Sequence, residues 1–204
     1  MDLGFARGFI VDYYEGGYRL IGTRDKRRYL VVPEGGQAPM DLEEDIVVLK
    51  RPVENIYLVA TAVMDMVCEL DGLDLIGFSG QGAEGWSMEP VRTRMEEGRI
   101  LYAGRYDSPD YELIVSRGCS LAIENNMITH CPEVREKLES FGIPVLVDSS
   151  SYESHPLGRV EWVKLYGVLI GREKEAQEAF DRQEKALERV GSQEASGKTV
   201  AFFY

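Results

Sequence analysis

The chain has 204 residues, 44% of them hydrophobic, and its 23 Lys and Arg against 35 Asp and Glu give a formal net charge of −12. This composition is that of a folded globular protein and excludes a disordered chain. The acidic balance disfavours a nucleic-acid partner, because the densest basic stretch, residues 24–28, also holds Asp25. Three cysteines, Cys68, Cys119 and Cys131, are an odd number in a large chain, which does not indicate a disulfide framework.

The first fifty residues are rich in short β-prone runs. Residues 9–14, 18–23 and 28–32 are separated by a glycine turn and by a charged turn, which predicts an antiparallel hairpin or meander. Residues 33–39 (PEGGQAP) read as a loop, and residues 45–49 as a further strand. We expect this β-rich segment to occupy residues 1–52.

From residue 55 onward, strand-like and helix-like segments alternate. The expected strands are residues 55–60, 73–78, 99–103, 119–124 and 143–148. This order predicts an α/β fold, a Rossmann-like lobe with a central, mostly parallel sheet flanked by helices.

Capping residues and apolar spacing mark the helices between these strands. Thr61 is expected to cap the first, and Ser108-Pro109-Asp110 to open another with Ser108 as the cap and Pro109 in the first turn. The inner stripes are expected to hold Val63, Val67 and Leu70 in one helix, Ile114 and Val115 in the next, and Val134, Leu138 and Phe141 in the last.

The end of the chain has a different pattern. Helices are expected over residues 157–170 and 173–190, then a polar linker and a final apolar run, residues 199–204 (TVAFFY). We expect that run to begin a second domain. When its own sheet is missing, we expect it either to pack on a neighbouring copy in a strand-exchanged dimer or to be disordered.

Ligands of open parallel sheets gather at the carboxyl ends of the strands, and five loops qualify here. One contains Gly80, Gly82 and Gly85 in a G-x-G-x-x-G pattern, with Asp107 22 residues further on. This pattern is compatible with a dinucleotide site, although Pro90 lies in the following helix. A nucleotide-dependent cytosolic enzyme is therefore the alternative interpretation, and a flexible glycine loop is the simpler one.

Other polar clusters carry weaker signals. The pair His130-Cys131 has no further ligands at metal-binding spacing, and residues 149–151 near His155 lack a nucleophile elbow. The aromatic side chains expected in the loops, Trp86, Tyr106 and Tyr152, suit the wall of a small-molecule cleft.

A longer stretch carries a family resemblance. The run DSSSYESHPLGRVEWVKLYGVLIG, from Asp148, resembles the end of the first lobe in substrate-binding proteins of ABC importers, the ferric-siderophore and cobalamin type. The segments YLVATAVMDMVCELDGLDLI, RILYAGRYDSPDYELIVSRGCSLAIENNMITHCPEV and REKLESFGIPVLVD resemble the same family, so the likeness covers roughly residues 53–166.

The resemblance implies a receptor that binds ligand between two lobes, without catalysis and without a cofactor. It implies an α/β lobe over residues 53–158, a helical connector over 159–190, and the linker and first strand of a second lobe over 191–204. It also implies an extracytoplasmic location, either periplasmic or as a membrane-anchored lipoprotein, and permease subunits as partners that Glu112 contacts. The ligand-facing residues would be Thr61, Met64, Trp86, Tyr106, Asn126, Met127, Ser150, Tyr152 and Arg159.

Overall fold

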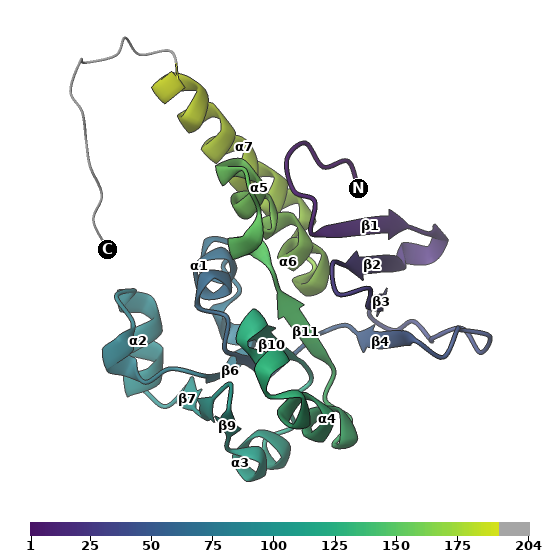
Figure 1. Cartoon of the computed structure of the whole chain (residues 1–204), viewed down its shortest axis with the longest axis vertical. Helices are drawn as coiled ribbons and strands as arrows, with labels where there is room; N and C mark the ends of the chain where they lie inside the picture. The colour runs from purple at the N-terminus through teal and green to yellow at the C-terminus, as the bar shows by residue number, and fades with distance from the viewer. Residues whose placement is uncertain (192–204) are drawn as a thin grey trace.

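Two sheets organise the computed structural model, which describes residues 1–191 (Figure 1). The expected linker and the TVAFFY strand, with the strand exchange predicted for it, lie outside the described residues. The first sheet has the order β1-β2-β3-β4. Its strands are β1 (Phe9–Tyr13), β2 (Arg19–Thr23), β3 (Arg28–Val32) and β4 (Ile46–Lys50), with a 3-10 turn, η1 (Glu15–Gly17), between β1 and β2.

The predicted meander is confirmed for the first three strands, which pair antiparallel. The fourth strand differs, because β4 runs parallel to β3 after a long connection over residues 33–45. The loop of that connection extends away from the body of the molecule (Figure 1).

The second sheet has five strands in the order β11-β10-β5-β6-β7, and all neighbouring strands are parallel. The predicted α/β fold class is therefore confirmed. The strands are β5 (Ile56–Leu58), β6 (Ile76–Ser79), β7 (Leu101–Tyr102), β10 (Ala122–Asn125) and β11 (Val145–Asp148).

Helices and short turns connect these strands. The helices are α1 (Thr61–Glu69), α2 (Glu89–Glu96), α3 (Tyr111–Ser116) and α4 (Pro132–Ser140). The 3-10 turns are η2 (Leu73–Leu75), η3 (Ala83–Gly85), η4 (Asn126–His130) and η5 (Ser150–Tyr152). A small hairpin of β8 (Gly104–Arg105) and β9 (Ser108–Pro109) precedes α3.

Two hydrophobic clusters pack on the opposite faces of the parallel sheet. Successive residues of β10 alternate between them, with Ala122 in one cluster and Ile123 in the other, as the two-residue period of a strand requires. The larger cluster joins α1 and α6 to the inner face of the four-stranded sheet, and the smaller one joins α3 and α4.

Two of the predicted helix starts are wrong. Ala60 precedes α1, and no side chain caps that helix. Ser108 and Pro109 are still paired in the β8–β9 hairpin, so the helix begins later, and the Asp110 carboxylate accepts the Leu113 N–H at 3.0 Å.

Two predicted core positions are also wrong. Val115 is 43% exposed because α3 turns it about 100° from buried Ile114. Phe141 is 46% exposed, because it follows the last helical residue of α4, and its ring lies 6.0 Å from the Tyr111 ring instead of against the sheet.

The last helices are α5 (Pro156–Glu161), α6 (Val163–Ile170) and α7 (Glu173–Gly191). The single helix expected over 157–170 is two helices that meet at Trp162. Ala176, Ala179 and Phe180 of α7 are buried, whereas Leu187 and Val190 are exposed, because this end of α7 extends beyond the body (Figure 1).

Candidate ligand-binding site

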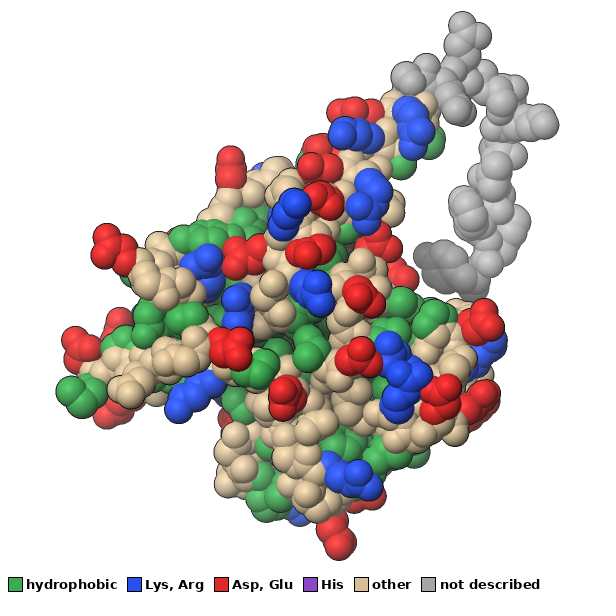
Figure 2. Space-filling view, turned by 180° about the vertical axis from the view of Figure 1, so that it is seen from behind, with side chains coloured by type: hydrophobic (Ala, Val, Ile, Leu, Met, Phe, Trp, Pro, Cys, Tyr) green, Lys and Arg blue, Asp and Glu red, His purple; other side chains and the backbone are tan. Residues whose placement is uncertain are grey.

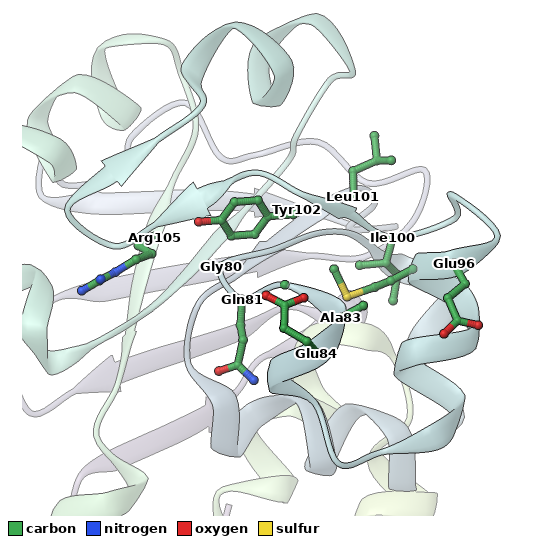
Figure 3. Close-up of a pocket in the computed structure, with 11 residues that line it drawn as sticks. Gly80, Gln81, Ala83, Glu84, Glu96, Ile100, Leu101, Tyr102 and Arg105 are labelled. Atoms are coloured by element: carbon green, nitrogen blue, oxygen red, sulfur yellow. The ribbon is translucent and has the colours of Figure 1, made fainter.

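The five loops that follow the parallel strands emerge at one edge of the sheet, since the strands all run in the same direction. A pocket of about 670 Å³ lies at this edge (Figure 3). It is bounded by the loop after β6, the end of α2 and the chain around β7. Polar groups reach it from Gln81, Glu84, Glu96, Tyr102 and Arg105.

Ser79 orders the loop that forms one wall of this pocket. Its hydroxyl donates to the Gln81 carbonyl at 2.7 Å and accepts the Gln81 N–H at 3.1 Å. The indole N–H of Trp86 donates to the same hydroxyl at 3.1 Å. Trp86 is 6% exposed, so its side chain is buried beneath the surface and is not available to a ligand in this structure.

The β8–β9 hairpin forms the next part of the edge. The Tyr57 hydroxyl donates to the Gly104 carbonyl at 2.9 Å, which ties the hairpin to the sheet. Gly104 has φ 82°, and a Cβ there would lie 2.2 Å from the Ser108 carbonyl oxygen, so only glycine fits this turn. The hairpin holds Arg105 beside Asp107, with 3.6 Å between their charged groups.

A buried polar network lies at the end of β11. The Asp148 carboxylate accepts hydrogen bonds from the Tyr166 and Ser150 hydroxyls, both at 2.8 Å. Burial raises the pKa of Asp148 and outweighs these two hydrogen bonds, which lower it. The Asn126 amide donates to the Asp148 carbonyl at 3.1 Å and accepts from Ser149 at 3.2 Å. This network joins the loops after β10 and β11.

Two buried carboxylates hold the segment that precedes β1. Glu161 accepts the backbone N–H groups of residues 4–6 at 2.7–3.0 Å, and Lys164 donates to it at 3.0 Å. Glu153 accepts the N–H groups of Arg7 and Gly8 and the indole N–H of Trp162. Both carboxylates therefore hold the N-terminal segment in place, a structural role that was not predicted from the sequence.

The structure places the predicted ligand-facing residues at three levels of burial. Thr61, Met127, Tyr152 and Arg159 are exposed, while Tyr106 and Asn126 are partly buried. Met64, Trp86 and Ser150 are buried, and Met64 packs entirely within the larger core cluster. Arg159 uses its Nε–H to donate to the Glu153 carbonyl at 3.1 Å. Ligand contact by these nine residues stays a prediction.

Sequence reasoning singled out none of the five polar side chains of the pocket, namely Gln81, Glu84, Glu96, Tyr102 and Arg105. Their position in the sequence could have identified two of them, because Tyr102 lies near the end of a predicted strand and Arg105 follows it, where ligands of a parallel sheet bind. Nothing in the residue types alone separates them from ordinary loop residues.

The glycine pattern takes a form that differs from the dinucleotide fingerprint. The fingerprint places its glycines at the start of a helix, whereas α2 begins at Glu89, four residues after Gly85. A Cβ at Gly82 would meet the Glu84 carboxylate at 2.5 Å, and one at Gly85 would meet the Gln81 amide at 2.5 Å. These glycines allow two polar side chains to fold back over the loop.

Within residues 1–191, no group of three or more His, Cys, Asp and Glu side chains is arranged to hold a metal ion. No helix in the same part of the chain has the length and apolar character needed to cross a membrane.

Comparisons with known proteins extend this description. No protein-family model matches the chain. An uncharacterized lipoprotein of Methanocaldococcus jannaschii is 27% identical over 104 residues, which is 48% of this chain and 24% of the lipoprotein.

Similar solved structures are periplasmic binding proteins. The heme-binding protein HutB of Vibrio cholerae has a TM-score of 0.56 at 16% identity, covering 69% of this chain and 50% of that protein. The petrobactin-binding protein YclQ of Bacillus subtilis has a TM-score of 0.56 at 9% identity, and the match covers 90% of this chain and 53% of that protein. A periplasmic heme-binding protein of Pseudomonas aeruginosa has a TM-score of 0.51 at 16% identity, and the match covers 67% of this chain and 45% of that protein. The resemblance predicted from the sequence is thus confirmed as a shared fold, and the chain spans about half the length of these proteins.

Proposed function

We propose that the chain is the first lobe and connector of a solute receptor for an ABC importer. It captures a ferric siderophore, a heme or a corrinoid and delivers the ligand to a membrane permease. The observation that carries this proposal is the periplasmic-binding-protein fold, with a pocket of about 670 Å³ at the carboxyl edge of the parallel sheet. Ligands of open α/β sheets bind at that edge.

The proposed division of the chain follows from this function. Residues 1–52 form the β-rich part of the lobe, 53–158 the α/β part and 159–190 the connector, and residues 191–204 lead into a second lobe. The proposed location is extracytoplasmic, with a lipid anchor as in the lipoprotein relative.

The proposed ligand contacts are exposed side chains at the carboxyl edge of the parallel sheet, on the loops after β10 and β11 and outside the 670 Å³ pocket beside β6 and β7. Tyr152 is 64% exposed and Met127 is 44% exposed, on the turns that follow β11 and β10. Neither side chain forms a hydrogen bond within the described chain, so both are free to pack on a flat apolar ligand. Arg159 adds a cation for an acidic group.

A calorimetric titration tests ligand binding. The intact protein is titrated with heme, a ferric siderophore, cobalamin and a simple oxyanion, and one of the first three is expected to bind. Tyr152→Ala should weaken that binding about tenfold or more, since an aromatic wall is lost. Phe141→Ala is the matched control, because Phe141 is an exposed aromatic residue on the opposite edge, before β11. Binding of none of the three, or equal loss in both variants, would remove the receptor proposal.

Glu112 is the proposed contact with the permease. It is exposed in the first turn of α3, where the helix dipole favours an acid whether or not a partner exists. An exposed carboxylate that meets an arginine guides docking and weakens with salt.

An uptake assay separates these two explanations. Glu112→Lys should leave folding and ligand binding unchanged but lower uptake through the intact transporter about tenfold. Glu136→Lys, a charge reversal at an exposed position of α4, should leave uptake unchanged. Normal uptake by Glu112→Lys at normal protein level would leave Glu112 with the helix-dipole role only.

A further inference from the structure

The outer face of the four-stranded sheet is unusually apolar. Its inner face, with Phe9, Val11, Ile21, Tyr29, Val31 and Leu49, is buried in the larger core cluster. Six of the alternate positions on the outer face are apolar, namely Ile10, Leu20, Leu30, Val32, Ile46 and Val48, beside the charged Asp12, Arg28 and Lys50. An antiparallel sheet with one solvated face normally carries polar residues there. Ile10 is nevertheless 61% exposed, so this outer face is covered incompletely.

Two hollows lie on this outer face. One, of about 390 Å³, is apolar and lies between Tyr14, Tyr18, Leu20, Pro39 and Leu42. The other, of about 330 Å³, lies beside Ile10 and is lined by five cations, Arg7, Arg24, Lys26, Arg27 and Arg28. Arg28 borders both hollows, which therefore adjoin.

Three of these cations have no acidic partner. Arg27 pairs with Glu139 at 2.8 Å, and Arg28 pairs with Glu43 and Asp45. In the part of the chain that the structure describes, Arg7, Arg24 and Lys26 form no ion pair. The hollow is therefore locally positive in a chain whose net charge is −12.

The connection before β4 has the opposite charge. Residues 33–45 hold five acids, and Asp41 and Glu44 are exposed and form no ion pair within residues 1–191. Met40 lies beside them and is completely exposed. The protruding edge at the left of Figure 2, where this connection lies, shows hydrophobic and acidic side chains together.

The basic and acidic groups lie at the same end of the sheet but on opposite sides. The Arg24 N–H donates to the Gly8 carbonyl, which places Arg24 beside the start of β1. Glu44 nearly adjoins β4, whose first residue, Ile46, pairs with Arg28 at the same end. The basic side is thus the β1 edge and the acidic side is the β4 edge.

We propose that a second copy of this chain covers the outer face, in a two-fold symmetric dimer whose axis runs along the strands. Such an axis lays the β4 edge of each copy over the β1 edge of its partner. The acidic connection of one copy then meets Arg7 and Arg24 of the other, and the contact occurs twice. Between these contacts, the exposed Ile10 and the partly exposed Leu20 and Val48 of the two copies pack on each other, whereas Leu30 and Val32 are already buried within each chain. This proposal does not depend on the identity of the transported ligand.

The area of the outer face limits the affinity of the proposed dimer. Four strands of five residues cover only about 17 Å by 19 Å. A stable interface needs about 800 Å² from each partner, so the connection over residues 33–45 must contribute to it. We therefore expect reversible association that depends on protein concentration.

Charge-swap sedimentation tests the dimer. The whole chain is followed by sedimentation velocity from low to high micromolar concentration, and its dimer dissociation constant is measured. Arg24→Glu and Glu44→Arg should each raise that constant about tenfold or more, and the double variant should recover to within about threefold of the original. Lys185→Glu, at an exposed position of α7, makes the same change in net charge as Arg24→Glu and should have no effect.

Three results would overturn the proposal. The first is a monomer at every concentration, and the second is a double variant that stays as weak as the single ones. The third is a monomeric wild type that binds vesicles of anionic phospholipid and loses this binding in Arg24→Glu, which would assign the face to a membrane. Circular dichroism melts confirm folding of each variant, and since neither Arg24 nor Glu44 forms an ion pair in the described chain, the melts should be unchanged.

Discussion

Glu124 is buried on β10, and neither oxygen of its carboxyl group has a hydrogen-bond partner among the described residues. Burial raises the pKa of Glu124 from 4.5 to about 8. The side chain is therefore neutral in the folded protein at pH 7, while it is ionised in the unfolded chain. A proton is taken up on folding between these two pKa values, so this group makes the protein less stable as the pH rises.

Glu124→Gln should remove this pH dependence. Wild-type stability is expected to fall between about pH 4.5 and 8, by on the order of 3–5 kcal/mol at most. The variant, whose amide does not titrate, should lack that decline and be the more stable protein at pH 8. Urea unfolding across this range measures the effect, with exposed Glu136→Gln as the control. Parallel stability curves for wild type and Glu124→Gln would contradict the prediction.

At the scale of an element, the segment before β1 is held by side chains instead of a neighbouring strand. Glu161 of α5 accepts three consecutive backbone N–H groups, from Gly4, Phe5 and Ala6, and contacts Lys164. Burial raises the pKa of Glu161, but these hydrogen bonds outweigh it and lower the pKa below its usual value. The ionised form is therefore the one that stabilises the fold.

Glu161→Gln should destabilise the protein by about 3–5 kcal/mol at neutral pH, since it leaves the Lys164 charge buried without its partner. The stabilisation by Glu161 is present above its unfolded pKa and is lost as the pH falls through the lower folded pKa. The two proteins should therefore become more similar in stability below about pH 4. Thermal unfolding at several pH values measures this, and Glu175→Gln, at an exposed pair on α7, serves as the control. An unchanged melting temperature for Glu161→Gln at pH 7 would show that the contact contributes nothing.

At the scale of the whole molecule, the two sheets are joined into one unit. The larger hydrophobic cluster contains residues of both sheets, and the buried Tyr29 hydroxyl of β3 donates to the Val145 carbonyl of β11 at 2.8 Å. The Arg27–Glu139 ion pair adds a second link at the surface. We expect the four-stranded sheet and the α/β part to unfold together.

Tyr29→Phe should lower the free energy of unfolding by about 1–2 kcal/mol, since a buried hydrogen bond is lost while the ring is kept. The transition should stay cooperative, with circular dichroism and the fluorescence of Trp86 and Trp162 changing at the same urea concentration. Tyr14→Phe, whose hydroxyl is on an exposed side chain, is the matched control. Two separate transitions in the wild type would show that the sheets are independent units.

Local pattern determined the order of the elements and the parallel sheet. The apolar run over 143–148 became a fully buried strand, and the expected core positions Val63 and Leu138 are buried, because burial of one face depends on near neighbours in the chain. Helix starts were predicted less well, since Ser108 is drawn into a hairpin by pairing with Arg105. The free energy of an N-cap is only about 1 kcal/mol, so the preference of Ser108 for a cap does not decide where the helix begins.

The pocket and the buried polar groups were decided by the tertiary structure alone. Glu161 and Ala6 are 155 residues apart in the chain, yet the carboxylate of one accepts the N–H of the other at 2.7 Å. Met64 was expected to face a ligand and lies in the core, while Tyr102 was not singled out and lines the pocket. Periodicity identifies which side of a segment is buried, but which distant groups meet there depends on how the sheets and helices pack.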